Sequence, residues 1–148
     1  MSAPLPEALA ATRDDFLALS KRDRLQLLLE FSNELPPLSE RYQGHEEELE
    51  RVEECQSPVF IDVTVGEPAD GPDIVRMVAT APAEAPTTRG FASILVQGLT
   101  GLHSAEVLAV PSDYPLTLGL QEAVSPLRIR GMVGMLGRVQ RQVRALVS

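Results

Sequence analysis

Cysteine is scarce in this chain: its 148 residues include one, Cys55. A single thiol cannot form an intramolecular disulfide, and it supplies too few ligands for a zinc finger or an iron–sulfur cluster cage. Cys55 therefore acts alone, acts with another molecule, or is inert.

Long hydrophobic runs are also missing. The longest apolar stretches are far shorter than the roughly 20 residues of a membrane-spanning helix, and the first residues lack the basic and then apolar pattern of a signal peptide. We therefore expect no membrane association and a cytoplasmic location, where a lone thiol stays reduced.

Basic residues are outnumbered, with 13 basic and 21 acidic side chains, a net charge of −8 and a pI of about 4.7. Such a chain is a poor nucleic-acid ligand, because that affinity comes mostly from neutralising phosphates. The charge is uneven: residues 1–55 carry 6 basic and 13 acidic groups, whereas residues 121–148 carry 5 and 1. The net charge of −8 therefore combines an acidic N-terminal part with a basic C-terminal segment.

The chain has no internal repeat or low-complexity tract, and 44% of it is hydrophobic. A chain of this length buries enough surface to fold without disulfides or a structural metal ion. We expect one domain over residues 1–148, in which residues 1–15 form either a helix or a loosely held N-terminal extension.

The first third of the chain is predicted to be helical and then acidic. Residues 5–18 have a helical pattern, and a second helix is expected to begin after Ser20 as its cap and to end before Pro36. Residues 39–54 are polar and strongly acidic. They form either a charged helical turn or a mobile loop.

Strand periodicity begins at residue 59. Apolar and other side chains alternate over 59–65, residues 66–72 are rich in turn formers, and 74–79 is a second apolar run. The two strands are predicted to form an antiparallel hairpin.

Three helices are expected in the rest of the chain. Thr87 or Thr88 is predicted to cap a helix that runs to about Thr100, and Ser104 to cap a short one. The last and clearest helix has Ser125 as its cap, followed by proline at the first helical position.

The last helix is amphipathic. Its apolar side chains fall within an arc of roughly 100°: Met132, Met135, Leu136, Val139, Val143 and Leu146. Arg128 projects onto this apolar side. The other arginines lie on the opposite side, which we expect to be solvated: Arg130, Arg138, Arg141 and Arg144. A row of glycines indicates close packing against a neighbour, because glycine otherwise only costs helix stability: Gly131, Gly134 and Gly137.

Cys55 is the main candidate for chemistry. It lies between the acidic stretch and the first strand, which predicts a loop at the edge of the sheet. Its polar flanks leave an exposed reactive thiol and a buried structural thiol equally open. His45 and His103 are more typical of surface residues than of catalysts, and Ser57 has no histidine in a triad motif.

The order of three motifs resembles the SufE family of sulfur acceptors over roughly residues 15–146. These motifs are LPPL at 35–38, V-x-x-C-Q-S-x-V at 52–59 and S-P-x-R-x-x-G at 125–131. The residues that carry the resemblance are Leu35 to Leu38, Val52, Cys55, Gln56, Ser57, Val59, Ser125, Pro126, Arg128 and Gly131.

The resemblance implies both a fold and a function. The fold is α+β of the SufE/IscU-like type, with a small antiparallel sheet of about three strands packed against several helices. The function is to stimulate a SufS-like cysteine desulfurase, take its persulfide sulfur onto Cys55, and deliver that sulfur to an iron–sulfur scaffold. The chain would be a carrier, a monomer or weak dimer, rather than an independent enzyme. It would hold no metal or cofactor, since pyridoxal phosphate belongs to the desulfurase.

The chain departs from the family pattern next to the cysteine. Family members usually have glycine at this position, whereas this chain has Glu54, preceded by Glu53. Two carboxylates should raise the pKa of the thiol, and the loss of glycine removes backbone freedom. The family's D-S-D-A stretch is also replaced, by APAEAPTTRGF. The alternative function is therefore a non-catalytic interaction module that binds a desulfurase without carrying sulfur.

The last expectations concern the role of Arg128 and the burial of the Cys55 thiol at rest. Arg128, near a helix N-terminus, either supports the thiolate of Cys55 or is a snorkelling or ion-paired side chain. A carrier shields its persulfide, so we expect a partly buried thiol at rest. An independent cysteine hydrolase is the weakest hypothesis, because no histidine or oxyanion motif accompanies Cys55.

Overall fold

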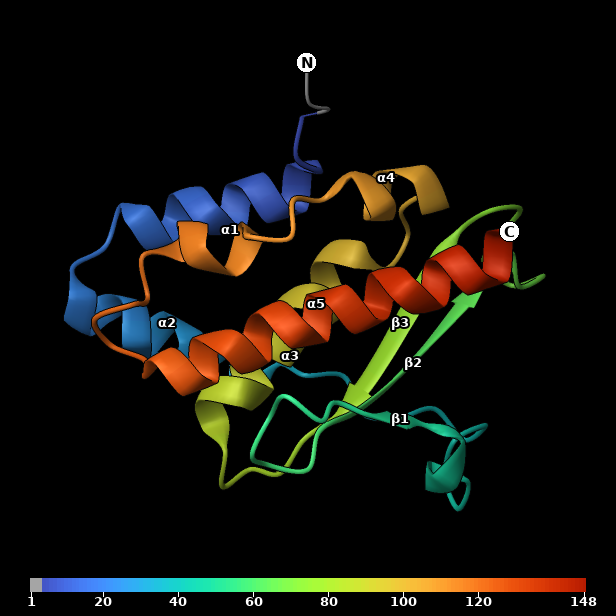
Figure 1. Ribbon diagram of the computed structural model, residues 1–148, viewed down its shortest axis with the longest axis horizontal. Helices are drawn as coiled ribbons and strands as arrows, with labels where there is room; N and C mark the ends of the chain where they lie inside the picture. Colours follow the sequence, from blue (N-terminus) through green and yellow to red (C-terminus); the bar gives the residue numbers. More distant parts are fainter. Residues whose placement is uncertain (1–3) are drawn as a thin grey trace.

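The computed structural model describes residues 4–148, which form a small sheet and five α-helices (Figure 1). The elements in chain order are α1 (Glu7–Leu17), α2 (Lys21–Asn33), the 3₁₀ helix η1 (Glu46–Glu48), β1 (Glu50–Arg51), β2 (Phe60–Val65), β3 (Val75–Thr80), α3 (Pro86–Leu99), α4 (Ser104–Ala109), the 3₁₀ helix η2 (Tyr114–Leu118) and α5 (Pro126–Val147). The fold is α+β, as expected. Of the segment 1–15, residues 7–15 belong to α1, and residues 1–3 lie outside the described part of the chain.

The sheet has three antiparallel strands in the order β1-β2-β3. The predicted hairpin is confirmed, because β2 and β3 pair along their whole length, with Val63 opposite Met77. Apolar residues at alternate positions of both strands are buried on one face: Ile61, Val63, Val75, Met77 and Ala79. This face forms one side of the core.

Helices α3 and α5 cover the buried face, α3 against β3 and α5 against β2. Helix α3 is the centre of the helical layer, since it also packs against α1, α2 and α5 (Figure 1). Across the other face of the sheet, the hydroxyl of Tyr42 donates a hydrogen bond to Asp62 at 2.8 Å. Tyr42 is 4% exposed, so the segment before β1 covers part of that face.

The acidic segment 39–54 contains a strand that the sequence pattern did not predict. It forms the turn η1 and then the two-residue edge strand β1, with Glu50 opposite Ile61 of β2. A strand of two residues is too short to show an alternating pattern.

Two of the four predicted helix caps are confirmed. Ser20 accepts from the backbone N–H of Asp23, and Ser125 accepts from that of Arg128. The caps expected for α3 and α4 are wrong. For α3 the reason is that Pro86, with its fixed φ, opens the helix before Thr87.

Helix α4 begins after His103 instead of after Ser104. The backbone N–H of His103 donates to the carboxylate of Glu106 at 3.0 Å, and the hydroxyl of Ser104 donates instead to Asp73 at 2.6 Å. The bond to Glu106 satisfies a backbone N–H at the start of the helix, which explains the earlier start.

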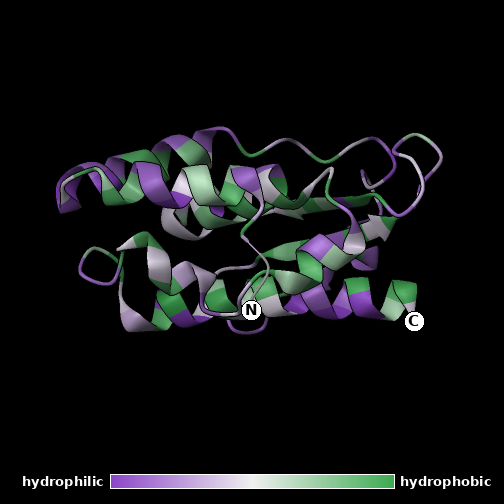
Figure 2. Cartoon of the chain, turned by 90° about the horizontal axis from the view of Figure 1, so that it is seen from above, coloured by the Kyte–Doolittle hydropathy of each residue, from purple (hydrophilic) through white to green (hydrophobic). Residues whose placement is uncertain are grey.

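The amphipathic character predicted for α5 is confirmed, and its last turns alternate between hydrophilic and hydrophobic residues in Figure 2. Five of the six predicted apolar residues are buried, and Leu146 is 54% exposed because it lies in the last turn. Within residues 4–148 no helix combines the length and hydrophobicity that crossing a membrane requires.

Gly90 sets the spacing between α2 and α3. A Cβ atom at this position would overlap the carbonyl oxygen of Leu28 and lie 2.9 Å from its Cδ1. Because backbone cannot yield as a side-chain tip can, Gly90→Ala is expected to lower the free energy of unfolding by about 1–3 kcal/mol in urea titrations. Gly137→Ala is the control, since nothing lies within 4 Å of its Cβ, and helix propensity should raise its stability by up to about 1 kcal/mol. Equal stability of the two variants would contradict this packing.

Candidate functional site

Cys55 lies in a six-residue loop, residues 53–58, between β1 and β2. The loop is closed at its base, where the backbone N–H of Val52 donates to the carbonyl of Val59 at 2.9 Å, and both side chains are fully buried. Within the loop, the N–H of Cys55 donates to the carbonyl of Val52 at 3.1 Å. The core thus anchors both ends of a tight turn that carries the thiol.

The loop packs directly against the glycine face of α5. The thiol of Cys55 donates to the carbonyl of Gly131, with the sulfur 3.7 Å from the oxygen. A Cβ on Gly131 would lie 3.0 Å from Sγ, and one on Gly134 would lie 2.6 to 2.7 Å from the side-chain carbons of Glu54. The predicted close packing is confirmed for these two glycines and is wrong for Gly137, which meets nothing within 4 Å.

This packing buries the thiol, as expected for the resting state: Cys55 is 8% exposed. Burial raises the pKa of Cys55 to about 11, and the charge of Glu54 adds to that shift while Arg138 opposes it. At pH 7 a thiol with this pKa is about one part in 10,000 thiolate. The resting side chain is therefore a neutral, weakly nucleophilic thiol.

Arg138 joins the loop to α5. It donates through Nε to Glu54 at 2.6 Å and through Nη1 to Glu50 of β1 at 2.7 Å. Although partial burial acts to raise the pKa of Glu54, the hydrogen bond from Arg138 and nearby positive charges hold it below its ordinary value. The Arg138 side chain is 17% exposed, which corrects the prediction of a solvated side chain. A helical projection does not show which loop covers the polar side of a helix.

Glu50 is held from a second side by Gln142, one turn beyond Arg138 on α5. Gln142 donates to Glu50 at 2.7 Å and accepts from the backbone N–H of Val63 at 3.0 Å. Val63 lies beyond the end of β1, so Gln142 occupies the position where a longer β1 would pair with β2. Helix α5 thus fixes the edge of the sheet as well as the loop.

Arg128 belongs to the same site, where it lines a small cavity together with Cys55 and Gly131. Its side chain is exposed, and Nη1 donates to the hydroxyl of Thr87 at 3.0 Å. Arg128 lies on the side of α5 that also carries Gly131, and its side chain is exposed because it belongs to the first turn of the helix. The positive charge that acts on the pKa of Cys55 belongs to Arg138. Support of a thiolate by Arg128 stays a prediction.

A cavity of about 30 Å³ adjoins the thiol. Its lining combines the cysteine loop with the first turns of α3 and α5: Cys55, Gln56, Ser57, Thr88, Leu127, Arg128 and Gly131. A space of this size holds about one water-sized group. The cavity therefore brings together two motifs, C-Q-S and S-P-x-R-x-x-G, that lie about 70 residues apart in the sequence.

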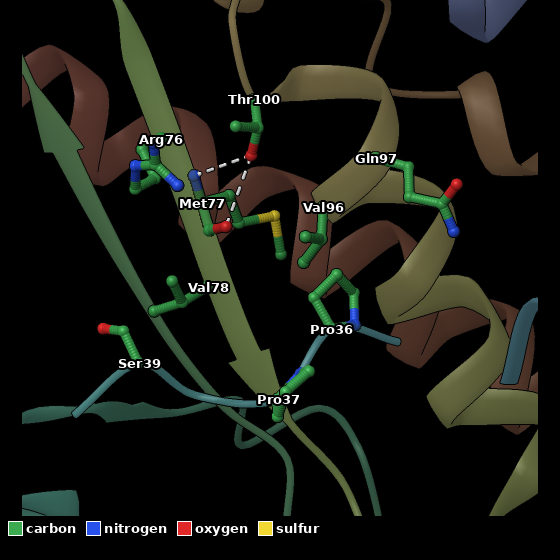
Figure 3. Close-up of a pocket in the computed structure, with 9 residues that line it drawn as sticks. All are labelled: Pro36, Pro37, Ser39, Arg76, Met77, Val78, Val96, Gln97 and Thr100. Carbon is green, nitrogen blue, oxygen red and sulfur yellow. Dashed lines mark hydrogen bonds between the residues drawn. The ribbon is translucent and has the colours of Figure 1, made fainter. Parts of the chain in front are cut away.

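A larger cavity, of about 450 Å³, lies at a different place, between α3, β3 and the segment after α2 (Figure 3). The residues that line it include Pro36, Val96 and Arg76, and Thr100 hydrogen-bonds both backbone groups of Met77 there. Arg76 is paired with Asp70. The lining residues of this cavity include no cysteine, histidine or carboxylate.

The two histidines lie outside the cysteine site. Both are exposed, with His45 3.9 Å from Glu47 and His103 3.5 Å from Asp73. The described residues, 4–148, contain no group of three or more His, Cys, Asp or Glu side chains arranged to hold a metal ion.

Sequence reasoning missed Arg138, Glu50 and Gln142 as parts of the site. One signal was available: Glu54 replaces a small residue next to Cys55, and a half-buried carboxylate requires a cation. Which arginine supplies it depends on how the loop lies on α5, which spacing along the chain does not specify.

Comparisons with known proteins identify the family of the chain. Residues 10–143 match the family described as "SufE: Fe-S metabolism associated domain". The chain belongs to the SufE family and has a role in iron–sulfur metabolism.

Three similar proteins illustrate the relationship. An uncharacterized SufE-like protein of Mycobacterium tuberculosis is 50% identical over 146 residues, covering 97% of this chain and 98% of that protein. The cysteine desulfuration protein SufE of Plasmodium vivax is 29% identical over 86 residues, covering 58% and 34%. The solution structure of a hypothetical protein from Thermus thermophilus has a TM-score of 0.81 and 39% identity, covering 97% of this chain and 98% of that one.

The raised pKa of Cys55 predicts an unusual pH profile for alkylation. Iodoacetamide reacts with the thiolate, so its rate with the native protein should rise about tenfold per pH unit beyond pH 9 and level off only near the pKa of about 11. In urea the rate should level off near pH 8.5, the ordinary thiol value. Whole-protein mass spectrometry gives the rate, since the chain has one cysteine. A native plateau near pH 8.5 would contradict the burial of the thiol.

Proposed function

We propose that this protein is the sulfur acceptor and activator of a cysteine desulfurase, and that Cys55 carries the sulfur. The observation that supports this most is the position of the single cysteine. It lies in a C-Q-S loop, anchored at both ends and beside a small cavity formed with the S-P-x-R-x-x-G turn. Both motifs belong to the resemblance that the family match supports.

The transfer step needs no oxidant or metal. The thiol of Cys55 loses its proton, and the thiolate attacks the outer sulfur of the persulfide on the desulfurase cysteine. A sulfur–sulfur bond forms at Cys55 while the bond between the two donor sulfurs breaks, and that electron pair leaves on the desulfurase thiolate. The products are a Cys55 persulfide and a regenerated desulfurase cysteine.

The resting geometry requires the loop to move before this step. The thiol is 8% exposed and points at the carbonyl of Gly131, so an incoming persulfide cannot reach it in line. Leaving the surface of α5 would expose the sulfur and lower its pKa together, because burial is the largest cause of the raised value. Return of the loop would place the new sulfur near the cavity of about 30 Å³ and shield it from water.

The remaining partners follow from this role. The sulfur passes from Cys55 to a scaffold that assembles iron–sulfur clusters, in the cytoplasm. Pyridoxal phosphate resides in the desulfurase, and this chain works without a cofactor. One thiol suits a carrier, since a scaffold needs several thiolates to hold iron.

A second candidate is an interaction module that binds a desulfurase without accepting sulfur. The carboxylate of Glu54 favours it, because its charge adds to the raised pKa of Cys55 where the family usually has glycine. In that case Cys55 would be a structural residue of the docking loop.

Sulfur transfer is tested by incubating the protein with an active cognate desulfurase and cysteine and then measuring the intact mass. We expect added mass of one sulfur atom or more, removed by a reducing agent, and no addition to the Cys55→Ser variant. The same variant should bind the desulfurase but fail to stimulate sulfide release. Stimulation by Cys55→Ser equal to that of the native protein would instead support the interaction module.

A further inference from the structure

We propose that Arg138 is a positioning residue that holds the Cys55 loop closed on α5 by binding Glu54 of the loop and Glu50 of β1. The four side chains Glu50, Glu54, Arg138 and Gln142 are called the latch below. The proposal deepens the proposed function, because opening the latch would be the step that makes Cys55 available to a persulfide.

The hydrogen bonds of Arg138 restrain the position of the loop, in addition to the effect of its charge. Its guanidinium bridges two carboxylates, with Nε on Glu54 at 2.6 Å and Nη1 on Glu50 at 2.7 Å. Glu50 is itself fixed by Gln142 and by its pairing in the sheet. The bond to Glu54 therefore ties the residue next to Cys55 to a rigid frame.

The close approach of backbones permits this bond. Glu54 lies over Gly134, where a Cβ atom would meet three of its side-chain carbons. Arg138 is one helical turn further along α5, so its side chain extends along the same face to the carboxylate. Gly134 thus leaves room for the side chain of Glu54, and Arg138 binds its carboxylate.

The hydrogen bonds of the latch stabilise the closed loop, but they are weak enough for the loop to open. Charge-assisted hydrogen bonds are the stronger kind, but both carboxylates are 32% exposed on their side chains, so water screens them. Loss of a bond worth about 1 kcal/mol raises the population of an open loop about fivefold. A partner surface that competes for Glu54 or Arg138 would have the same effect.

Two explanations of Arg138 predict opposite results. If Arg138 acts only through its charge, its removal should slow the reaction of Cys55, because that charge favours the thiolate. If Arg138 holds the loop, its removal should speed the reaction, because the thiol becomes accessible more often.

The test measures alkylation of Cys55 by iodoacetamide at pH 8, with no desulfurase present, so it does not depend on whether Cys55 accepts sulfur. We expect Arg138→Gln to react about fivefold faster than the native protein. Arg138→Lys keeps the charge but cannot bridge both carboxylates, so its rate should lie between the two. A rate for Arg138→Gln equal to or below the native rate would overturn the proposal.

Two further variants separate the latch from general effects. Arg141→Gln removes an exposed charge from the same helix, one that acts on Glu54 without a hydrogen bond, and should leave the rate unchanged. Glu50→Gln weakens the latch from the sheet side and should react faster. Because Glu50 is not among the charges that shift the pKa of Cys55, the proposal remains testable even if Arg138→Gln is unstable. A native rate for Glu50→Gln, or a fivefold rise for Arg141→Gln, would also overturn it.

Discussion

The close approach of the 53–58 loop to α5 is the contact on which the site depends. It exists because Gly131 and Gly134 leave no Cβ atoms between the helix and the loop. The contact buries Cys55, brings the C-Q-S turn to the first turn of α5, and sets Glu54 within reach of Arg138. Without it the chain would still hold a sheet and five helices, but the thiol would be an ordinary surface group.

Burial and charge act together on the sulfur. Removal from water is the largest cause of the raised pKa of Cys55, and the neighbouring carboxylate adds to it. Arg138 offsets part of the carboxylate's effect through its charge and at the same time ties that carboxylate to α5. The resting protein therefore keeps the thiol neutral and covered. Under the proposed function, a closed resting state and an open reacting state would make this acidic environment compatible with sulfur transfer.

Much of the fold and part of the site follow from the sequence alone. Alternation over 59–65 and the apolar run over 74–79 predict the hairpin, and Ser125 followed by Pro126 predicts the start of α5, since these signals are local. The strand β1 and the role of Arg138 were not predictable in this way. Both depend on contacts between segments that are remote in the chain, and a helical projection assigned Arg138 to solvent.

The replacement of glycine by Glu54 is visible in the sequence, yet its meaning changes once the structure is known. Next to a thiol, a carboxylate hinders formation of the thiolate. In the structure, Glu54 also accepts a hydrogen bond from Arg138, and its side chain fills the space over Gly134. A residue that looks like a defect of the site is thus part of what holds the site together.

The packing of Cys55 against α5 can be tested by comparing alanine substitutions at two glycines of that helix. An added methyl group lies 3.0 Å from Sγ in Gly131→Ala but meets nothing within 4 Å in Gly137→Ala. If contact with Gly131 buries the thiol, Gly131→Ala displaces the loop, and iodoacetamide should alkylate Cys55 at least about fivefold faster than in Gly137→Ala. Equal rates in the two variants would contradict the burial of Cys55 by the glycine face of α5.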